Sequence, residues 1–111
     1  MLNQAVLVGR IATDPELKQT DSGKNVSNIT LAVPRSFKNI NGEYDTDFIS
    51  CVLWRGVAES TVNYCKKGDL VGVKGRIQSR SYEVNDEKRQ TVEVVAEKIT
   101  FLSSKKHEID E

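Results

Sequence analysis

Residues 47–55 show the two-residue period of a β-strand whose two faces differ in character. Alternate positions give one face of Phe48, Ser50, Val52 and Trp54, and an opposite face of Ile49, Cys51 and Leu53. If the second face is buried, two aromatic rings remain on the first with only small side chains between them. At about 3.3 Å per residue the rings lie roughly 20 Å apart. The stretch therefore predicts a half-buried strand that can present a stacking surface.

The chain length and composition predict one soluble domain. With 111 residues, the chain can bury a single core but not two. Its 38% hydrophobic content and seven scattered glycines are typical of a globular protein. No apolar run approaches the roughly 20 residues of a membrane span, and the first residues lack a signal pattern. We therefore expect a cytoplasmic protein without membrane contact.

The residues that usually perform catalysis or bind metals are scarce. Cys51 and Cys65 are the only cysteines and form no CxxC pair, so we expect two reduced core side chains. His107 is the only histidine and lies in a charged tail, which excludes a histidine-based cluster. We find no phosphate-binding P-loop, no clustered Asp/Glu metal site and no nucleophile beside a base. The sequence thus predicts no enzymatic activity and no cofactor.

The charge is balanced overall but unevenly distributed. The chain has 16 basic and 16 acidic side chains. Three of the acids, Glu108, Asp110 and Glu111, lie in the last four residues, so residues 1–107 carry 16 basic against 13 acidic side chains. A modestly basic body with an acidic end is compatible with a polyanionic ligand.

Strand patterns dominate the chain, with one helical pattern among them. We expect strands at 3–11, 26–37, 47–55, 70–82 and 91–102, and a helix at 57–66. Gly9 marks a bend, Pro34 interrupts its strand, and Gly68 follows the helix end. The order β-β-β-α-β-β is that of the all-β OB-fold, a five-stranded Greek-key barrel with its helix between strands 3 and 4. We assign residues 1–103 to this domain and 104–111 to a short charged tail.

Aromatic and basic side chains interleave on what we expect to be one exposed side. The rings are Phe37, Phe48, Trp54 and Tyr82, and the cations beside them include Arg35, Lys38, Arg55, Lys74, Arg76 and Arg80. Rings stack on the face of any base, and cations follow a phosphate backbone without reading sequence. On OB-folds the face of strands two and three commonly binds oligonucleotides. The pattern predicts a site for single-stranded nucleic acid without strong sequence preference.

Each of these features also has a plainer interpretation. A single ring is more often packed in a core or dimer interface, and we assign Phe101 and Tyr64 to such packing. Trp54 alone is as consistent with a core position as with stacking. The row of Lys74, Arg76 and Arg80 alone is typical of a solvated strand face. The binding interpretation depends on both patterns falling on adjacent strands.

Several blocks of the sequence resemble the family of bacterial single-stranded DNA-binding proteins from Met1 to about Leu102. The matching blocks are Leu7–Arg10, Asp14–Glu16, Asn28–Val33, Asp47–Trp54, Lys66–Gly68 and Val73–Ile77. The resemblance implies that Phe37, Phe48, Trp54 and Tyr82 stack bases. It also implies that Arg80, Lys66 and Lys67 contact the strand, and that the protein is a homotetramer whose first strand pairs across a dimer interface.

The chain departs from the long members of that family at its C-terminal end. Those members have a flexible linker and an acidic tip that recruits replication and repair proteins, whereas here residues 103–111 close the chain. Recruitment through this short tail is therefore doubtful. We expect a nucleoid-associated protein that protects single-stranded DNA in replication, recombination, repair or DNA uptake. The alternative is a primosome-type OB-fold accessory module whose aromatic face binds protein.

Overall fold

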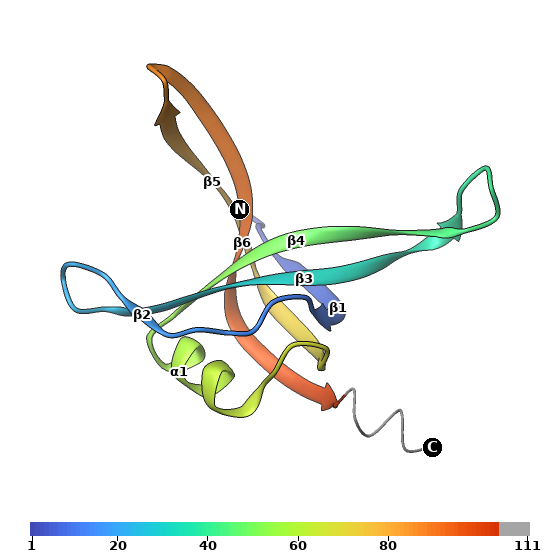
Figure 1. Ribbon diagram of the computed structural model, residues 1–111, viewed down its shortest axis with the longest axis horizontal. Helices are drawn as coiled ribbons and strands as arrows, with labels where there is room; N and C mark the ends of the chain where they lie inside the picture. The colour runs from blue at the N-terminus through green and yellow to red at the C-terminus, as the bar shows by residue number, and fades with distance from the viewer. Residues whose placement is uncertain (105–111) are drawn as a thin grey trace.

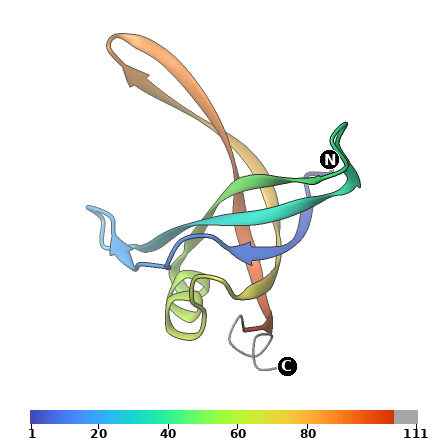
Figure 2. The same ribbon diagram turned by 45° about the vertical axis from the view of Figure 1, so that its right-hand side comes forward.

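The computed structural model describes residues 1–104 and consists of a strand barrel, one helix and projecting hairpins (Figures 1 and 2). In chain order the elements are β1 (Ala5–Ile11), β2 (Lys18–Gln19), β3 (Asn25–Lys38), β4 (Tyr44–Trp54), α1 (Arg55–Tyr64), β5 (Leu70–Val84) and β6 (Glu87–Ser103). Because β2 has only two residues and lies outside the barrel, α1 follows the third of the five barrel strands, as predicted. The predicted charged tail lies outside the described residues from position 105 onward.

The strands form one sheet in the order β1-β5-β6-β4-β3-β2, and pairing of β1 with β3 closes it. Arg10 pairs with Ala32 at this closure. The neighbours are antiparallel except for β4 and β6, where Cys51 pairs with Val94 in parallel. A closed five-stranded barrel with this connectivity is the OB-fold, so the fold class expected from the sequence is confirmed.

The alternating patterns of the strands produce the barrel core. Its buried side chains are Ile11, Ile29, Leu31, Cys51, Leu53, Ala58, Cys65, Val71, Val73, Val94 and Ala96. Two glycines allow strands to approach closely, Gly9 at the closure between β1 and β3 and Gly75 between β5 and β6. A Cβ at Gly9 would overlap the carbonyl oxygen of Ala32, and one at Gly75 would overlap that of Val95. Both cysteines are buried and unpaired, as predicted.

The helix is displaced from its predicted position. It begins at Arg55, directly after β4, so Gly56 belongs to the helix rather than ending the strand. Arg55, where the helix follows the strand without a loop, has a φ of 53°, a conformation rare for residues other than glycine. Lys66 follows the helix end instead of occupying its last turn. In the described part of the chain, no helix is long and apolar enough to cross a membrane.

Two side chains differ in exposure from what the alternation of their strands predicts. Ile77 continues the alternation of the buried Val71 and Val73 but is 48% exposed, because β5 continues past the barrel into the β5–β6 hairpin (Figure 1). Val52 was expected in solvent but is 5% exposed. It lies in the middle of the sheet, with Asn28 of β3 and Val95 of β6 as its neighbours.

Candidate functional site

The outer face of β3 and β4 presents the two rings expected from the sequence. In the register of this hairpin, Phe48 lies opposite Ala32 and Trp54 opposite Val26. Phe48 is 68% exposed and Trp54 39% exposed, so neither ring belongs to the core. Ser50 is exposed between them. The strand therefore keeps small side chains between two accessible rings.

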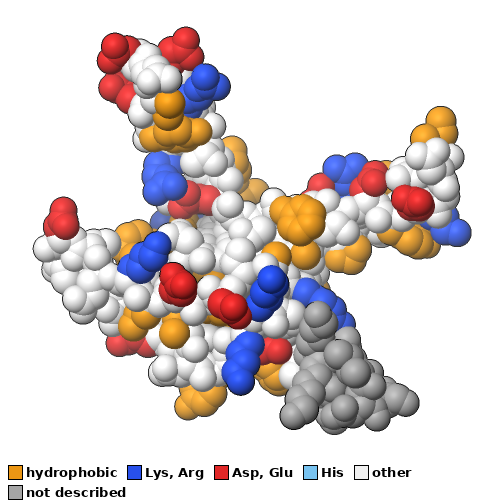
Figure 3. Space-filling view, in the orientation of Figure 1, with side chains coloured by type: hydrophobic (Ala, Val, Ile, Leu, Met, Phe, Trp, Pro, Cys, Tyr) orange, Lys and Arg blue, Asp and Glu red, His pale blue; other side chains and the backbone are white. Residues whose placement is uncertain are grey.

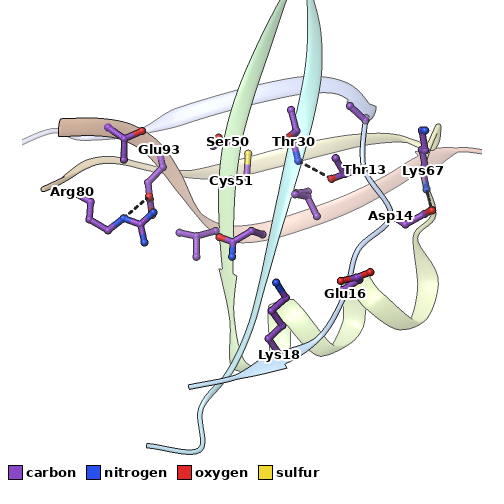
Figure 4. A pocket seen from close by; sticks show the side chains of 15 residues that line it. Thr13, Asp14, Glu16, Lys18, Thr30, Ser50, Cys51, Lys67, Arg80 and Glu93 are labelled. Carbon is purple, nitrogen blue, oxygen red and sulfur yellow. Dashed lines mark hydrogen bonds and ion pairs between the residues drawn. The ribbon is translucent and has the colours of Figure 1, made fainter. Parts of the chain in front are cut away.

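A groove crosses this face at residues 28–30 and 50–52 (Figure 4), which lie between the two rings in the register of the hairpin. It has a volume of about 660 Å³, and Ser50 and Val52 of β4 form part of its lining. One wall is the segment from residue 12 to residue 18, which is fixed to β3 because the Thr30 amide donates to Thr13 Oγ1 at 3.2 Å. Its charged lining comprises three cations from separate segments, Lys18, Lys67 and Arg80, and three acids, Asp14, Glu16 and Glu93.

The loop after α1 is held through its backbone. The Lys66 amide donates to Asp69 Oδ2 at 2.9 Å, and the Lys67 amide donates to Asp14 Oδ1 at 3.2 Å. These hydrogen bonds fix the loop through backbone amides rather than through the ammonium groups. Both lysine side chains are exposed. The loop thus directs Lys67 into the groove wall while its ammonium group stays accessible (Figure 4).

A buried carboxylate links three side chains of β5 beside the groove. Glu93 of β6 is 7% exposed and lies opposite Gln78. Gln78 Nε2 donates to Glu93 Oε2 at 3.2 Å, and Arg80 Nε lies 3.5 Å from Glu93 Oε1. Arg76 in turn donates to Gln78 Oε1 at 3.2 Å. Arg76, Gln78 and Arg80 therefore share one face of β5.

Two of the predicted cations, Arg35 and Lys38, lie on the β3–β4 hairpin and have different partners there. Arg35 donates to both carboxylate oxygens of Asp47, with its shortest contact at 2.9 Å. This pairing lowers the pKa of Asp47 and raises the pKa of Arg35, mainly through the hydrogen bonds between them. Lys38 lies over the Tyr44 ring at 5.9 Å. Arg35 therefore has an anionic partner, whereas Lys38 is paired with a ring.

A second, smaller hollow adjoins Trp54. It has a volume of about 360 Å³ and is lined by Thr20, Ser22, Lys24, Trp54 and Arg55. The hollow at Trp54 thus has a cation at the start of α1, Arg55, and another on the loop after β2, Lys24. The hollow extends the aromatic and basic surface beyond the groove.

The remaining predicted residues lie farther from the groove. Tyr82 is 46% exposed on the β5–β6 hairpin, and Phe37 is 64% exposed near the end of β3. Acidic side chains gather at the tip of the β5–β6 hairpin, where Glu83, Asp86 and Glu87 lie (Figure 3). Lys74 lies opposite Val6 of β1 and lines neither hollow. All twelve predicted binding residues are exposed, but only Lys67 and Arg80 line the groove itself.

Three residues at this surface were missed from the sequence. Tyr44 was given no role, and its pairing with Lys38 depends on the register of the β3–β4 hairpin. Lys18 has no distinguishing pattern in its extended segment. Glu93 interrupts an apolar run, which is the signal of a buried charge with a partner. Phe101 and Tyr64, expected to be packed, are 49% and 79% exposed and line another hollow, at α1 and β6.

The surface is equipped for stacking and phosphate contact. Burial raises the pKa of the Cys51 thiol to about 11 and also raises the pKa of Cys65, so neither thiol is a ready nucleophile. Within residues 1–104 no group of three His, Cys, Asp or Glu side chains is placed to hold a metal. Accessible rings interleaved with cations suit a ligand of planar groups on a phosphate backbone.

Comparison with known proteins gives a consistent result. The sequence profile described as "Single-strand binding protein family" matches residues 2–102. "Single-stranded DNA-binding protein 3" of Listeria innocua is 55% identical over 108 residues, which are 96% of this chain and 68% of that protein. "Single-stranded DNA-binding protein B" of Bacillus subtilis is 51% identical over 110 residues, 97% of this chain and 96% of that protein. The "Single-stranded DNA-binding protein" of Halalkalibacterium halodurans is 56% identical over 103 residues, 92% of this chain and 61% of that protein.

Proposed function

The chain belongs to the single-strand binding protein family, and from this membership and its surface we propose that it binds single-stranded DNA without sequence preference. The observation that supports this most is the outer face of β3 and β4, where Phe48 and Trp54 flank a groove with three cations. It acts by binding and shielding the strand, with no chemical step.

Base stacking supplies the short-range part of the binding. Phe48 and Trp54 hold bases on either side of the groove, while Phe37 and Tyr82 hold bases along the two projecting hairpins. Each stacked base contributes roughly 1–3 kcal/mol, and any base can stack, so the contribution does not depend on sequence. The small side chain of Ser50 leaves room for the bases between the rings.

Phosphate contacts supply the salt-dependent part. The cations proposed for this role are Arg35, Lys38, Arg55, Lys66, Lys67, Lys74, Arg76 and Arg80, joined by Lys18 at the groove wall. Lys67 and Arg80 are central because they line the groove, and Lys74 is peripheral. Arg35 contributes least among the hairpin cations, since Asp47 already neutralises much of its charge. Each neutralised phosphate adds about −0.7 to the slope of log K against log salt concentration.

The protein acts as a homotetramer in this proposal. Val6 and Val8 of β1 are 70% and 52% exposed, which gives the first strand an apolar outer row suited to pairing with a second copy. DNA then wraps over several barrels. The expected setting is the nucleoid, where single strands arise in replication, recombination, repair or DNA uptake. The solution mass, measured together with the number of nucleotides bound, tests this assembly.

The test of the function compares ring variants in a DNA-binding assay. Fluorescence anisotropy of a labelled dT oligomer at low salt measures the affinity of the wild type, of a double variant Phe37→Ala/Phe48→Ala, and of Tyr64→Ala. Tyr64 is the matched control, because its ring is exposed but lies on α1 away from the groove. We expect the double variant to bind more weakly and Tyr64→Ala to bind like the wild type.

Two results would contradict the proposal. The first is wild-type affinity for the dT oligomer no greater than for an unrelated acidic polymer, which would favour a protein-binding accessory module instead. The second is equal loss of affinity in the double variant and in Tyr64→Ala, which would mean that the β3–β4 face has no special role.

A further inference from the structure

Glu93 is one of three acids that line a groove proposed to bind a polyanion, and it is the buried one, since Asp14 and Glu16 are exposed. Its side chain is 8% exposed, whereas that of Arg80 beside it is 66% exposed. An ionised carboxylate in this place repels phosphate and carries a desolvation cost. The contacts of Glu93 with Gln78 and Arg80 suggest a role for this carboxylate.

The two carboxylate oxygens of Glu93 have different partners. Oε1 faces Arg80 Nε at 3.5 Å, and Oε2 accepts from Gln78 Nε2 at 3.2 Å. Because an ionised carboxylate can only accept, it fixes which end of the Gln78 amide faces it. The amide oxygen of Gln78 then faces away and accepts from Arg76 at 3.2 Å.

We propose that Glu93 is a positioning residue that orients the guanidinium groups of Arg76 and Arg80 toward the phosphates of bound single-stranded DNA. It holds Arg80 directly and Arg76 through the Gln78 amide. The three β5 side chains lie two residues apart on one strand face, and Gln78 pairs across the sheet with Glu93. The inference rests on the proposed function and specifies how two of its cations are held.

For the substitution Glu93→Gln, the loss of negative charge and the loss of positioning predict opposite effects on the affinity for DNA. The substitution Glu93→Gln removes one negative charge from the groove, which alone would strengthen binding to a polyanion. The amide that replaces the carboxylate, however, cannot accept at both of its terminal atoms. Either Arg80 faces an NH2 group, or the Gln78 amide turns over and presents its NH2 to Arg76. One guanidinium loses its partner in both cases.

The experiment measures affinity for a labelled dT oligomer over a range of salt concentrations, using the full chain. For Glu93→Gln we expect binding about three- to tenfold weaker at low salt. We also expect a salt slope smaller in magnitude by about 0.7, the contribution of one phosphate contact. Glu97→Gln is the matched control, because Glu97 is exposed on the same strand and lines the hollow at α1 rather than the groove. It should bind as tightly as the wild type or slightly more tightly.

A double-mutant comparison separates positioning from other roles. In an Arg76→Ala/Arg80→Ala background, Glu93→Gln should no longer weaken binding, because the groups that it positions are absent. Gln78→Met leaves the contact between Glu93 and Arg80 in place and removes the two hydrogen bonds that link Glu93 to Arg76 through Gln78. It should therefore weaken binding less than Glu93→Gln, and it decides the question if Glu93→Gln does not fold.

Several outcomes would overturn the inference. Tighter binding by Glu93→Gln with an unchanged salt slope would show that the carboxylate acts only through its charge. An equal loss of affinity in the background without the two arginines would show a merely structural role. Wild-type protein that fails to bind the dT oligomer would instead refute the proposed function, and this result appears before any variant is made.

Discussion

Substitution of two residues of β4 tests the assignment of its faces, because Phe48 and Leu53 have opposite surroundings. Leu53 is 0% exposed, and a buried Leu→Ala change lowers the free energy of unfolding by about 2–5 kcal/mol. Phe48 is 68% exposed, so about a third of its surface is covered. A buried Phe covers about 150–250 Å², so Phe48 removes about 50–80 Å² from water, which contributes about 1–2 kcal/mol.

The effects on DNA binding should be reversed. Phe48→Ala removes one stacked base, a loss of about 1–3 kcal/mol that weakens binding roughly 5- to 150-fold. Leu53→Ala leaves the outer face unchanged, so its folded fraction should bind like the wild type. Urea unfolding measures the free energy of unfolding, and fluorescence anisotropy of a labelled dT oligomer at low salt measures the affinity for DNA.

One pattern of results would refute this reasoning. If Phe48→Ala destabilised the protein as much as Leu53→Ala and the folded fraction still bound DNA normally, the ring would be a packing residue. The outer face of β4 would then not be the binding face, and the stacking role of Phe48 would be excluded.

Three further predictions concern the barrel, a thiol and an ion pair. Gly75→Ala should lower the free energy of unfolding, measured in thermal melts, by about 1–3 kcal/mol because its Cβ overlaps the Val95 carbonyl. Gly72→Ala is the control and should have little effect, because no atom lies nearer than 3.9 Å to its Cβ. Burial raises the pKa of Cys51 from 9.0 to about 11. Between these two pH values the thiol ionises in the unfolded state but not in the folded state, so the free energy of unfolding should fall by about 2–3 kcal/mol as pH rises. A Cys51→Ala variant with the same pH dependence would contradict this. Arg35 lowers the pKa of Asp47, so the pair is intact above the ordinary aspartate pKa and is lost as pH falls. NMR titration should show a higher Asp47 pKa in Arg35→Ala, and an unchanged pKa would mean that the pairing is absent in solution.

The fold could be predicted because local pattern and global topology agree. The two-residue period places Ile29, Leu31, Cys51 and Leu53 in the core of β3 and β4 correctly. The helix start could not be predicted, because Arg55 adopts a left-handed conformation that its residue type disfavours. Val52 was misplaced because a strand in the middle of a curved sheet can bury both faces, and the two-residue period does not distinguish this case.

The exposure of the candidate residues could be predicted from the sequence, but their arrangement could not. Exposed rings are visible in the sequence, and Phe48, Trp54 and Tyr82 are indeed accessible. Pairings across strands were not visible, because they depend on register. The Arg35–Asp47 contact requires the β3–β4 hairpin, and the contacts of Glu93 require β6 beside β5. These contacts decide which cations are available to a ligand.

The fluorescence of Trp54 during titration with a dT oligomer tests the central claim most directly. Trp54 is the only tryptophan, so its emission reports on this ring alone. The stacking account predicts saturable quenching at low salt, reversed as salt displaces the DNA. Unchanged emission while anisotropy shows the same oligomer bound would contradict the claim that bases stack on Trp54.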